Sequence, residues 1–288
     1  MKLLIALSVL FTLLIPPAMA NPRQEPSEKY ETMAVFTTTA PLSWFISSVA
    51  GDSVSISVLV PEGADSHVYE PKTEQMTAIS SAKIYFSIGN FSPFEASRLP
   101  KIEEQNPSLI IVRLNEGLNE GHDEIGHDPH IWTSVSSAPK ILENILKALV
   151  KADPQNMDLY NENYHSALDK IKELDTFIKG RFDEAGCKGK SFIVYHPAWG
   201  RFAEDYGIQQ IAVEHEGKEP KINMLAALID TARKKGIKTI FAAPSDPKRN
   251  IRILAGEIGA DIVIIDPLAA DWLQNMYYAA EEIVKALR

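Results

Sequence analysis

The stretch 154–184 has the sequence PQNMDLYNENYHSALDKIKELDTFIKGRFDE, with no glycine or proline between Pro154 and Gly180. Apolar side chains recur along it at steps of three and four residues, which is the period of one face of an α-helix. They are Leu159, Tyr160, Tyr164, Leu168, Ile171, Leu174, Phe177 and Ile178. Asp153 is a suitable N-cap and Pro154 fits the first helical position. The pattern predicts one helix of about 27–30 residues, about 40 Å long. The average α-helix of a globular protein has only about 11–12 residues.

On both sides of this helix, short apolar runs alternate with amphipathic segments. The expected strands are Met33–Thr37, Val54–Val60, Lys83–Ile88, Leu109–Arg113, Ser191–Tyr195, Gln209–Val213, Thr239–Ala242 and Asp261–Ile265. The expected helices are Pro41–Ala50, Glu74–Ser81, Ala138–Val150, Arg201–Tyr206, Asn223–Lys235, Lys248–Ile258 and Trp272–Leu287. Apolar strands that alternate with helices are typical of parallel sheets covered on both faces.

The predicted fold class is therefore α/β, with two β/α lobes joined by one long rigid helix. Each lobe is expected to hold a roughly four-stranded parallel sheet. The predicted boundaries are 31–152 for the first lobe, 153–186 for the linking helix and 187–288 for the second lobe. The length of the chain suits two modest domains.

The first twenty residues have the pattern of a signal peptide. Lys2 gives a positive start, 3–15 is an apolar run too short to span a bilayer comfortably, and Ala18-Met19-Ala20 is a small-x-small cleavage pattern. We predict cleavage after Ala20, a flexible leader over 21–30 and export to the periplasm. No cysteine follows the apolar run, so no lipid anchor is expected.

Composition excludes several classes of function. Cys187 is the sole cysteine, which rules out an intramolecular disulfide and a thiolate metal cluster. The net charge of −9 argues against nucleic acid and anionic lipid as partners. An acidic surface suits a cation as ligand, although such surfaces are common.

Polar residues follow four of the predicted strands. His67 comes after the strand at 54–60, His130 after the strand at 109–113, His196 after the strand at 191–195 and Asp266 after the strand at 261–265. Ligands of open α/β sheets bind beyond the carboxyl ends of the strands. Each lobe would then supply two metal ligands to a shared cleft.

Three imidazoles and one carboxylate suit Zn²⁺, whereas Mn²⁺ prefers more oxygen ligands. Four protein ligands close a tetrahedral site, and a catalytic zinc normally keeps an open water position. The set favours binding over hydrolysis. Taken singly, a loop histidine is more often solvated, and an aspartate before proline more often caps a turn. No compact metal motif is present to decide between these interpretations.

Four groups of residues, taken together and in order, resemble the zinc/manganese receptor family of ABC importers. They are Gly63-x-Asp65-x-His67-x-Tyr69-Glu70-Pro71, Asp128-Pro129-His130-Ile131-Trp132, Tyr195-His196-Pro197-Ala198-Trp199 and Ile265-Asp266-Pro267-Leu268. The resemblance covers nearly the whole chain after the leader. It implies two β/α lobes joined by a long helix, with His67, His130, His196 and Asp266 as metal ligands. Manganese members typically have Glu at the third position, so His196 points to zinc.

The resemblance implies a periplasmic, monomeric receptor that is not an enzyme and delivers Zn²⁺ to the membrane permease of an ABC importer. Manganese as the cargo is the main alternative. A zinc hydrolase would need a general base, for which Glu70, Glu214 and Glu216 are the candidates. A metal buffer or adhesin without a transporter would share the same fold and site.

Some details depart from the family or stay open. The loop before the second ligand is short, 115–128, and its His122 and His127 form either a solvated loop or a weak zinc-collecting site. His127 competes with His130 for the ligand role. Water could replace Asp266 as the fourth ligand, with Asp271 as another carboxylate nearby. His165 and His215 are expected to be structural residues.

Two mechanistic expectations follow. Protons compete with zinc for the imidazoles, so affinity should fall as the pH drops through about 6.5, the value of free imidazole. The long helix should restrict the lobes to small tilts.

Overall fold

The computed structural model describes residues 32–64, 69–89, 93–118, 128–214 and 222–288. The predicted signal peptide at 1–20 and leader at 21–30 lie outside these ranges. Within them, no helix combines the length and apolar character needed to cross a membrane.

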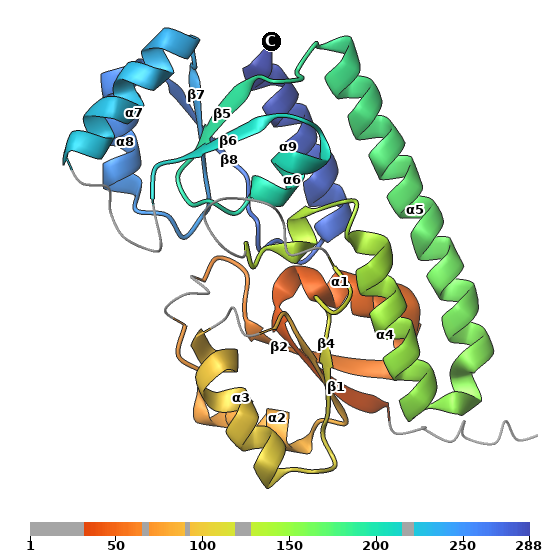
Figure 1. The fold of residues 1–288 in the computed structure, drawn as a ribbon. Helices are drawn as coiled ribbons and strands as arrows, with labels where there is room; N and C mark the ends of the chain where they lie inside the picture. The colour runs from red at the N-terminus through yellow and green to blue at the C-terminus, as the bar shows by residue number, and fades with distance from the viewer. Residues whose placement is uncertain (1–31, 65–68, 90–92, 119–127, 215–221) are drawn as a thin grey trace, which may run out of the picture. The chain divides into compact units, whose positions relative to one another are not determined.

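The first half of the described chain forms a parallel sheet with the strand order β2-β1-β3-β4 (Figure 1). Its elements are β1 (Met33–Thr39), α1 (Ala40–Ala50), η1 (Gly51–Ser53), β2 (Val54–Val60), α2 (Thr73–Ser81), β3 (Ile84–Ser87), α3 (Pro93–Gln105) and β4 (Ile110–Arg113). A short 3-10 helix, η2 (Ile131–Thr133), and α4 (Ala138–Ala152) follow. β1 and β3 lie in the interior of the sheet, which agrees with the burial of five consecutive residues in β1 and of all four in β3.

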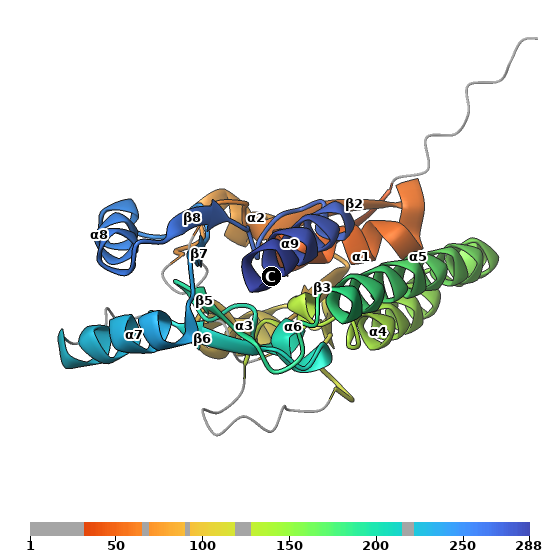
Figure 2. The same cartoon turned by 90° about the horizontal axis from the view of Figure 1, so that it is seen from above.

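The second half repeats this arrangement with the order β6-β5-β7-β8, again parallel throughout. Its elements are β5 (Ser191–Val194), α6 (Gly200–Asp205), β6 (Gln209–Ala212), α7 (Ile222–Lys235), β7 (Thr239–Ala242), α8 (Lys248–Ile258), β8 (Asp261–Ile264) and α9 (Trp272–Leu287). Figures 1 and 2 show α7 and α8 on one side of this sheet and α9 on the other. The predicted α/β class with two four-stranded parallel sheets is confirmed.

The long helix is also confirmed. A 3-10 turn, η3 (Pro154–Asn156), leads into α5 (Met157–Glu184), which has 28 residues. α5 packs against α1 and α4 of the first half and against α9 of the second. The bidentate pair between Arg181 and Glu281, at 2.6 and 3.0 Å, fastens α5 to α9. The exact lobe boundaries, 31–152, 153–186 and 187–288, stay a prediction.

Two local features differ from the prediction. Asp153 occupies the N-cap position of η3, but its side chain caps no backbone N–H; its Oδ2 accepts hydrogen bonds from Asn156 Nδ2 at 2.7 Å and Tyr160 Oη at 2.6 Å. Helix α3 was not predicted, because Pro100 interrupts its pattern. Pro93 fits the first helical turn, and the buried Phe94, Leu99 and Ile102 hold the helix against the sheet despite the internal proline.

The two halves share one hydrophobic cluster that extends from β1 through α5 to α9. Trp272, at the start of α9, is a buried member of this cluster and contacts the first half. The Trp272 ring lies 4.9 Å from that of Trp44 and 4.5 Å from that of Phe45, both in α1. Its Nε1–H donates to Trp132 O at 2.6 Å. The lobes are therefore joined by packed aromatic side chains as well as by the long helix.

Replacing Trp272 by alanine should lower the free energy of unfolding by about 3–5 kcal/mol, since it leaves a cavity between α1 and α9. Urea denaturation would measure the loss. Tyr278→Ala on the same helix is the matched control, because this tyrosine is 48% exposed and should cost no more than about 0.5 kcal/mol. Equal losses in the two variants would contradict the role of Trp272.

A buried carboxyl group, Glu95 of α3, connects the ends of β1 and β3. It accepts hydrogen bonds from the hydroxyls of Thr38 and Ser87 and from the backbone N–H of Ile88. Burial raises the pKa of Glu95 from 4.5 to about 7, although these donors and Arg113 lower it in part. Burial also raises the pKa of the neighbouring Tyr85.

Because the folded state holds the Glu95 proton more tightly than the unfolded state, this group stabilises the fold below about pH 4.5 and the contribution is lost as the pH rises through about 7. Over that window the loss amounts to about 3 kcal/mol. Glu95→Gln should remove this decline. Urea titrations of both proteins at pH 5 and pH 8 would measure it, and parallel pH dependences would refute the assignment.

Candidate metal site

Two of the predicted ligands, His130 and His196, face each other. His130 directly precedes η2, and His196 lies two residues beyond β5. Their Nε2 atoms are 3.3 Å apart, and their rings meet edge to face with centroids 5.2 Å apart. His130 is buried, with 5% of its surface exposed. The structure therefore brings together one histidine from each half of the chain.

A carboxylate lies behind each imidazole. Asp128 Oδ1 is 2.7 Å from His130 Nδ1 and also accepts the backbone N–H of His130 at 2.9 Å. Glu214 Oε1 is 3.4 Å from His196 Nδ1. Burial alone would raise the pKa of Asp128, but the charges of His130 and Arg201 and the hydrogen bonds from His130 outweigh it and hold this pKa below its ordinary value. Asp128 is thus an anionic acceptor for the His130 ring.

These carboxylates set the tautomer of both rings. When Nδ1–H of a histidine donates to a carboxylate, the lone pair of the ring is on Nε2. The two Nε2 atoms lie 3.3 Å apart, close enough for both to bind one cation placed between them. Two nitrogens bound at about 2.0–2.1 Å to one tetrahedral Zn²⁺ would stand roughly 3.3 Å apart. The spacing of the pair therefore matches that of two zinc ligands.

His130, His196 and Asp266 line the same pocket, together with Glu214 and Asp246. The pocket has about 510 Å³ of free space, part of it open to solvent. Asp266 lies two residues after β8, and its Oδ1 accepts the N–H of Leu268 at 2.8 Å. Burial raises the pKa of Asp266, the charge of Glu62 adds to this, and the Leu268 N–H partly offsets both.

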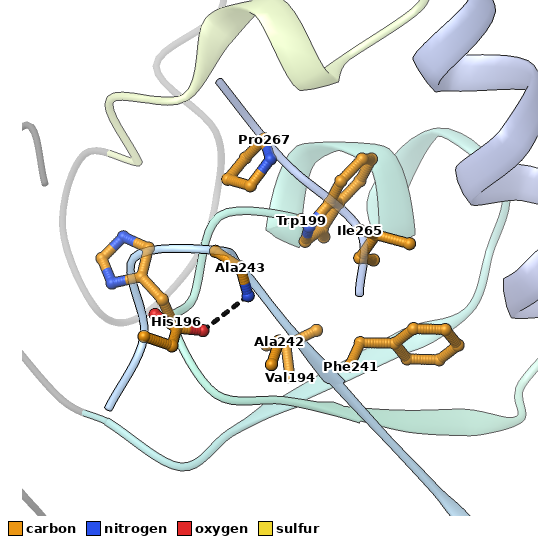
Figure 3. Close-up of a pocket in the computed structure, with 9 residues that line it drawn as sticks. Val194, His196, Trp199, Phe241, Ala242, Ala243, Ile265 and Pro267 are labelled. Carbon is orange, nitrogen blue, oxygen red and sulfur yellow. Dashed lines mark hydrogen bonds between the residues drawn. The ribbon is translucent and has the colours of Figure 1, made fainter. Parts of the chain in front are cut away.

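A smaller cavity adjoins this pocket, at the ends of the second sheet (Figure 3). His196, Trp199 and Pro267 lie around it, and the dashed line marks the Ala243 N–H donating to Asp246 Oδ2 at 2.7 Å. Trp132 supports the other imidazole, since its ring is 5.5 Å from that of His130. Aromatic and apolar walls around a metal pocket limit the access of water.

Several predicted residues are not placed at the site. His67, His122, His127 and His215 lie outside the described residues. Within the ranges that the structure describes, no group of three His, Cys, Asp or Glu side chains is arranged to hold a metal ion. Asp271 is the N-cap of α9, where it accepts the N–H of Gln274, and His165 is exposed on α5. The four-ligand set remains a prediction.

The sequence analysis gave no role to Asp128, and it weighed Glu214 as a catalytic base only. The signal for Asp128 was its position two residues before His130, from which it reaches both the backbone and the ring of that residue. Glu214 is 18 positions from His196 in the sequence. It comes close because β5 and β6 are neighbours in the sheet, which periodicity alone does not reveal.

Comparison with known proteins agrees with this geometry. The family model described as zinc-uptake complex component A, periplasmic, matches residues 35–286. A putative metal-binding protein of Treponema pallidum is 30% identical over 268 residues, covering 86% of this chain and 83% of its own. The high-affinity zinc uptake system protein ZnuA of Bacillus subtilis is 25% identical over 281 residues, covering 92% and 88%.

Solved structures give the same result. A crystal structure of ZnuA, 34% identical, superposes with a TM-score of 0.84 and covers 90% of this chain and 100% of its own. A deletion mutant of ZnuA with zinc bound, also 34% identical, has a TM-score of 0.82 and covers 89% and 98%. With the family model matching nearly all of the described chain, the predicted family is confirmed: this chain belongs to the periplasmic component A family of zinc-uptake complexes.

Proposed function

We propose that this chain is an extracytoplasmic receptor that binds Zn²⁺ in the pocket containing His130 and His196 and delivers it to an ABC importer. The observation that carries the proposal is the pair of Nε2 atoms at 3.3 Å, each on a ring whose Nδ1 faces a carboxylate. Asp266 in the same pocket and His67 complete the proposed ligand set. The family match and the zinc-bound relative support zinc as the cargo.

The proposal includes several finer points. The protein would be exported by its signal peptide with cleavage after Ala20, act as a monomer and carry no lipid anchor. Its membrane partner would be the permease of the importer. Zinc is cargo in this proposal, so its binding must be both tight and reversible.

The hydrolase alternative is disfavoured by the position of Glu214. Of the two candidate bases that the structure describes, Glu70 and Glu214, only Glu214 lines the pocket, and its carboxylate contacts His196 Nδ1. Glu70 is exposed, and Glu216 lies outside the described residues. A carboxylate behind a metal ligand raises the basicity of that ligand and fixes its ring. Its role here is to orient His196.

Manganese is the alternative cargo. The pocket contains the carboxylates of Glu214, Asp246 and Asp266. Of these, Glu214 is directed at His196 Nδ1, and Asp128, behind the pocket wall, is directed at His130 Nδ1. Both carboxylates thus strengthen nitrogen ligands, which Zn²⁺ accepts more readily than Mn²⁺.

The metal preference can be measured on protein that has been stripped with a chelator. Competitive titration should give one tight Zn²⁺ per chain, which excess Mn²⁺ does not displace. His130→Ala, His196→Ala and Asp266→Ala should each weaken binding by more than the about 10–100-fold expected for loss of an outer partner. His165→Ala, an exposed histidine on α5, is the matched control. Tight manganese binding would overturn the zinc assignment, and absence of any tight metal would overturn the receptor proposal.

The orienting carboxylates make a separate prediction. Asp128→Asn and Glu214→Gln keep the shape of the side chain but remove its charge, so each should weaken zinc binding by about 10–100-fold without changing the stoichiometry. Isothermal titration against a competing chelator would measure this. Glu204→Gln, an exposed residue in α6, serves as the control. Unchanged affinity in both carboxylate variants would show that the rings are held in place by packing alone.

A further inference from the structure

The segment 128–137, which carries His130, belongs to the first half of the chain by sequence but is bonded to the second half. It lies between β4 and α4. Arg201 Nε donates to Asp128 O at 2.8 Å. Trp132 Nε1 donates to Pro267 O at 2.7 Å, in the loop that also carries Asp266. The start and the middle of the segment 128–137 are therefore connected to the second half.

Asp205, the last residue of α6, makes the most extensive of these connections. Its Oδ2 accepts the Ser134 hydroxyl and the Ser136 backbone N–H, both at 3.0 Å. Its Oδ1 accepts the Ser136 hydroxyl at 2.5 Å. A single carboxylate thus fixes the backbone and side chains of two residues that lie four and six positions after His130.

The charge of Asp205 also suits this place. Ser134 and Ser136 immediately precede α4, and the first turn of α4 contains no acidic residue. The N-cap of α4, Ser137, makes no capping bond with its side chain. An anion near the first turn of a helix is stabilised by the helix dipole. Asp205 supplies this anion from the other half of the chain.

We propose that Asp205 is a positioning residue for the metal site: it holds the segment 128–137 against the second half, so that His130 faces His196 before any metal binds. His130, His196 and Asp266 then move as one body, and the two imidazoles need no ordering when zinc arrives. The inference rests on the proposed zinc-binding function. A preorganised ligand pair binds more tightly because the entropy of ordering the chain is not lost on binding.

The first test is hydrogen exchange of the whole protein with and without zinc. Backbone amides of 130–137 should already be protected in stripped wild-type protein, and zinc should change their exchange little. In Asp205→Ala, the same amides should exchange faster without metal and recover protection on adding zinc. A segment that is unprotected in stripped wild-type protein would overturn the inference.

The second test is zinc affinity. Asp205→Ala should weaken zinc binding by about tenfold. This is near the lower end of the loss in affinity that follows mutation of residues supporting the metal ligands. Ser136→Ala removes the hydrogen bond from the Ser136 hydroxyl to Asp205 at an exposed position, so it should also weaken zinc binding, by a smaller factor. This variant keeps the test informative if Asp205→Ala unfolds. Asp158→Ala, in the exposed first turn of α5, is the matched control. Unchanged zinc affinity in both Asp205→Ala and Ser136→Ala would overturn the inference.

A double-mutant cycle separates positioning from general destabilisation. In the Asp205→Ala background, His130→Ala should weaken zinc binding by a smaller factor than in wild type, whereas Asp266→Ala should weaken it by the same factor in both. If Asp205→Ala changes the effect of neither His130→Ala nor Asp266→Ala on zinc binding, or changes both effects by the same factor, the positioning role is overturned. Wild-type protein that binds no zinc would overturn the proposed function and this inference with it.

Discussion

The facing pair of imidazoles is the feature on which the rest of the site depends, because His130 and His196 come from different halves of the chain and their Nε2 atoms lie 3.3 Å apart. Each ring is fixed from behind by a carboxylate, Asp128 for His130 and Glu214 for His196. Because folding already holds the two rings at this spacing, a cation that binds between them loses little entropy in ordering these ligands.

Holding the rings requires that the two sheets do not separate. The long helix α5 packs on both halves, and the Trp272 ring lies against Trp44 and Phe45 of α1. The hydrogen bond that Arg201 donates to Asp128 O and those that Asp205 accepts from Ser134 and Ser136 cross between the halves close to the site itself. These contacts connect the two sheets both through the long helix and directly beside the site.

Much of the fold could be predicted from the sequence, because parallel strands in this chain are short apolar runs and the helices between them are amphipathic. The strand ends then indicated His130, His196 and Asp266. What could not be predicted depends on contacts between distant segments. Glu214 meets His196 through the pairing of β5 with β6, and Asp205 reaches Ser134 and Ser136 across 71 and 69 positions. Helix α3 was missed because burial of Phe94 and Leu99 outweighs the local cost of Pro100.

The identical strand order of the two sheets makes β4 and β8 equivalent positions of a duplicated scaffold. The loop after β4 carries His130, and the loop after β8 carries Asp266. Equivalent places in the two sheets therefore carry an imidazole in one and a carboxylate in the other. In such a scaffold, the side chain that follows a strand can be replaced without altering the packing of either sheet. A substitution there can therefore change which cation is preferred while the fold stays the same.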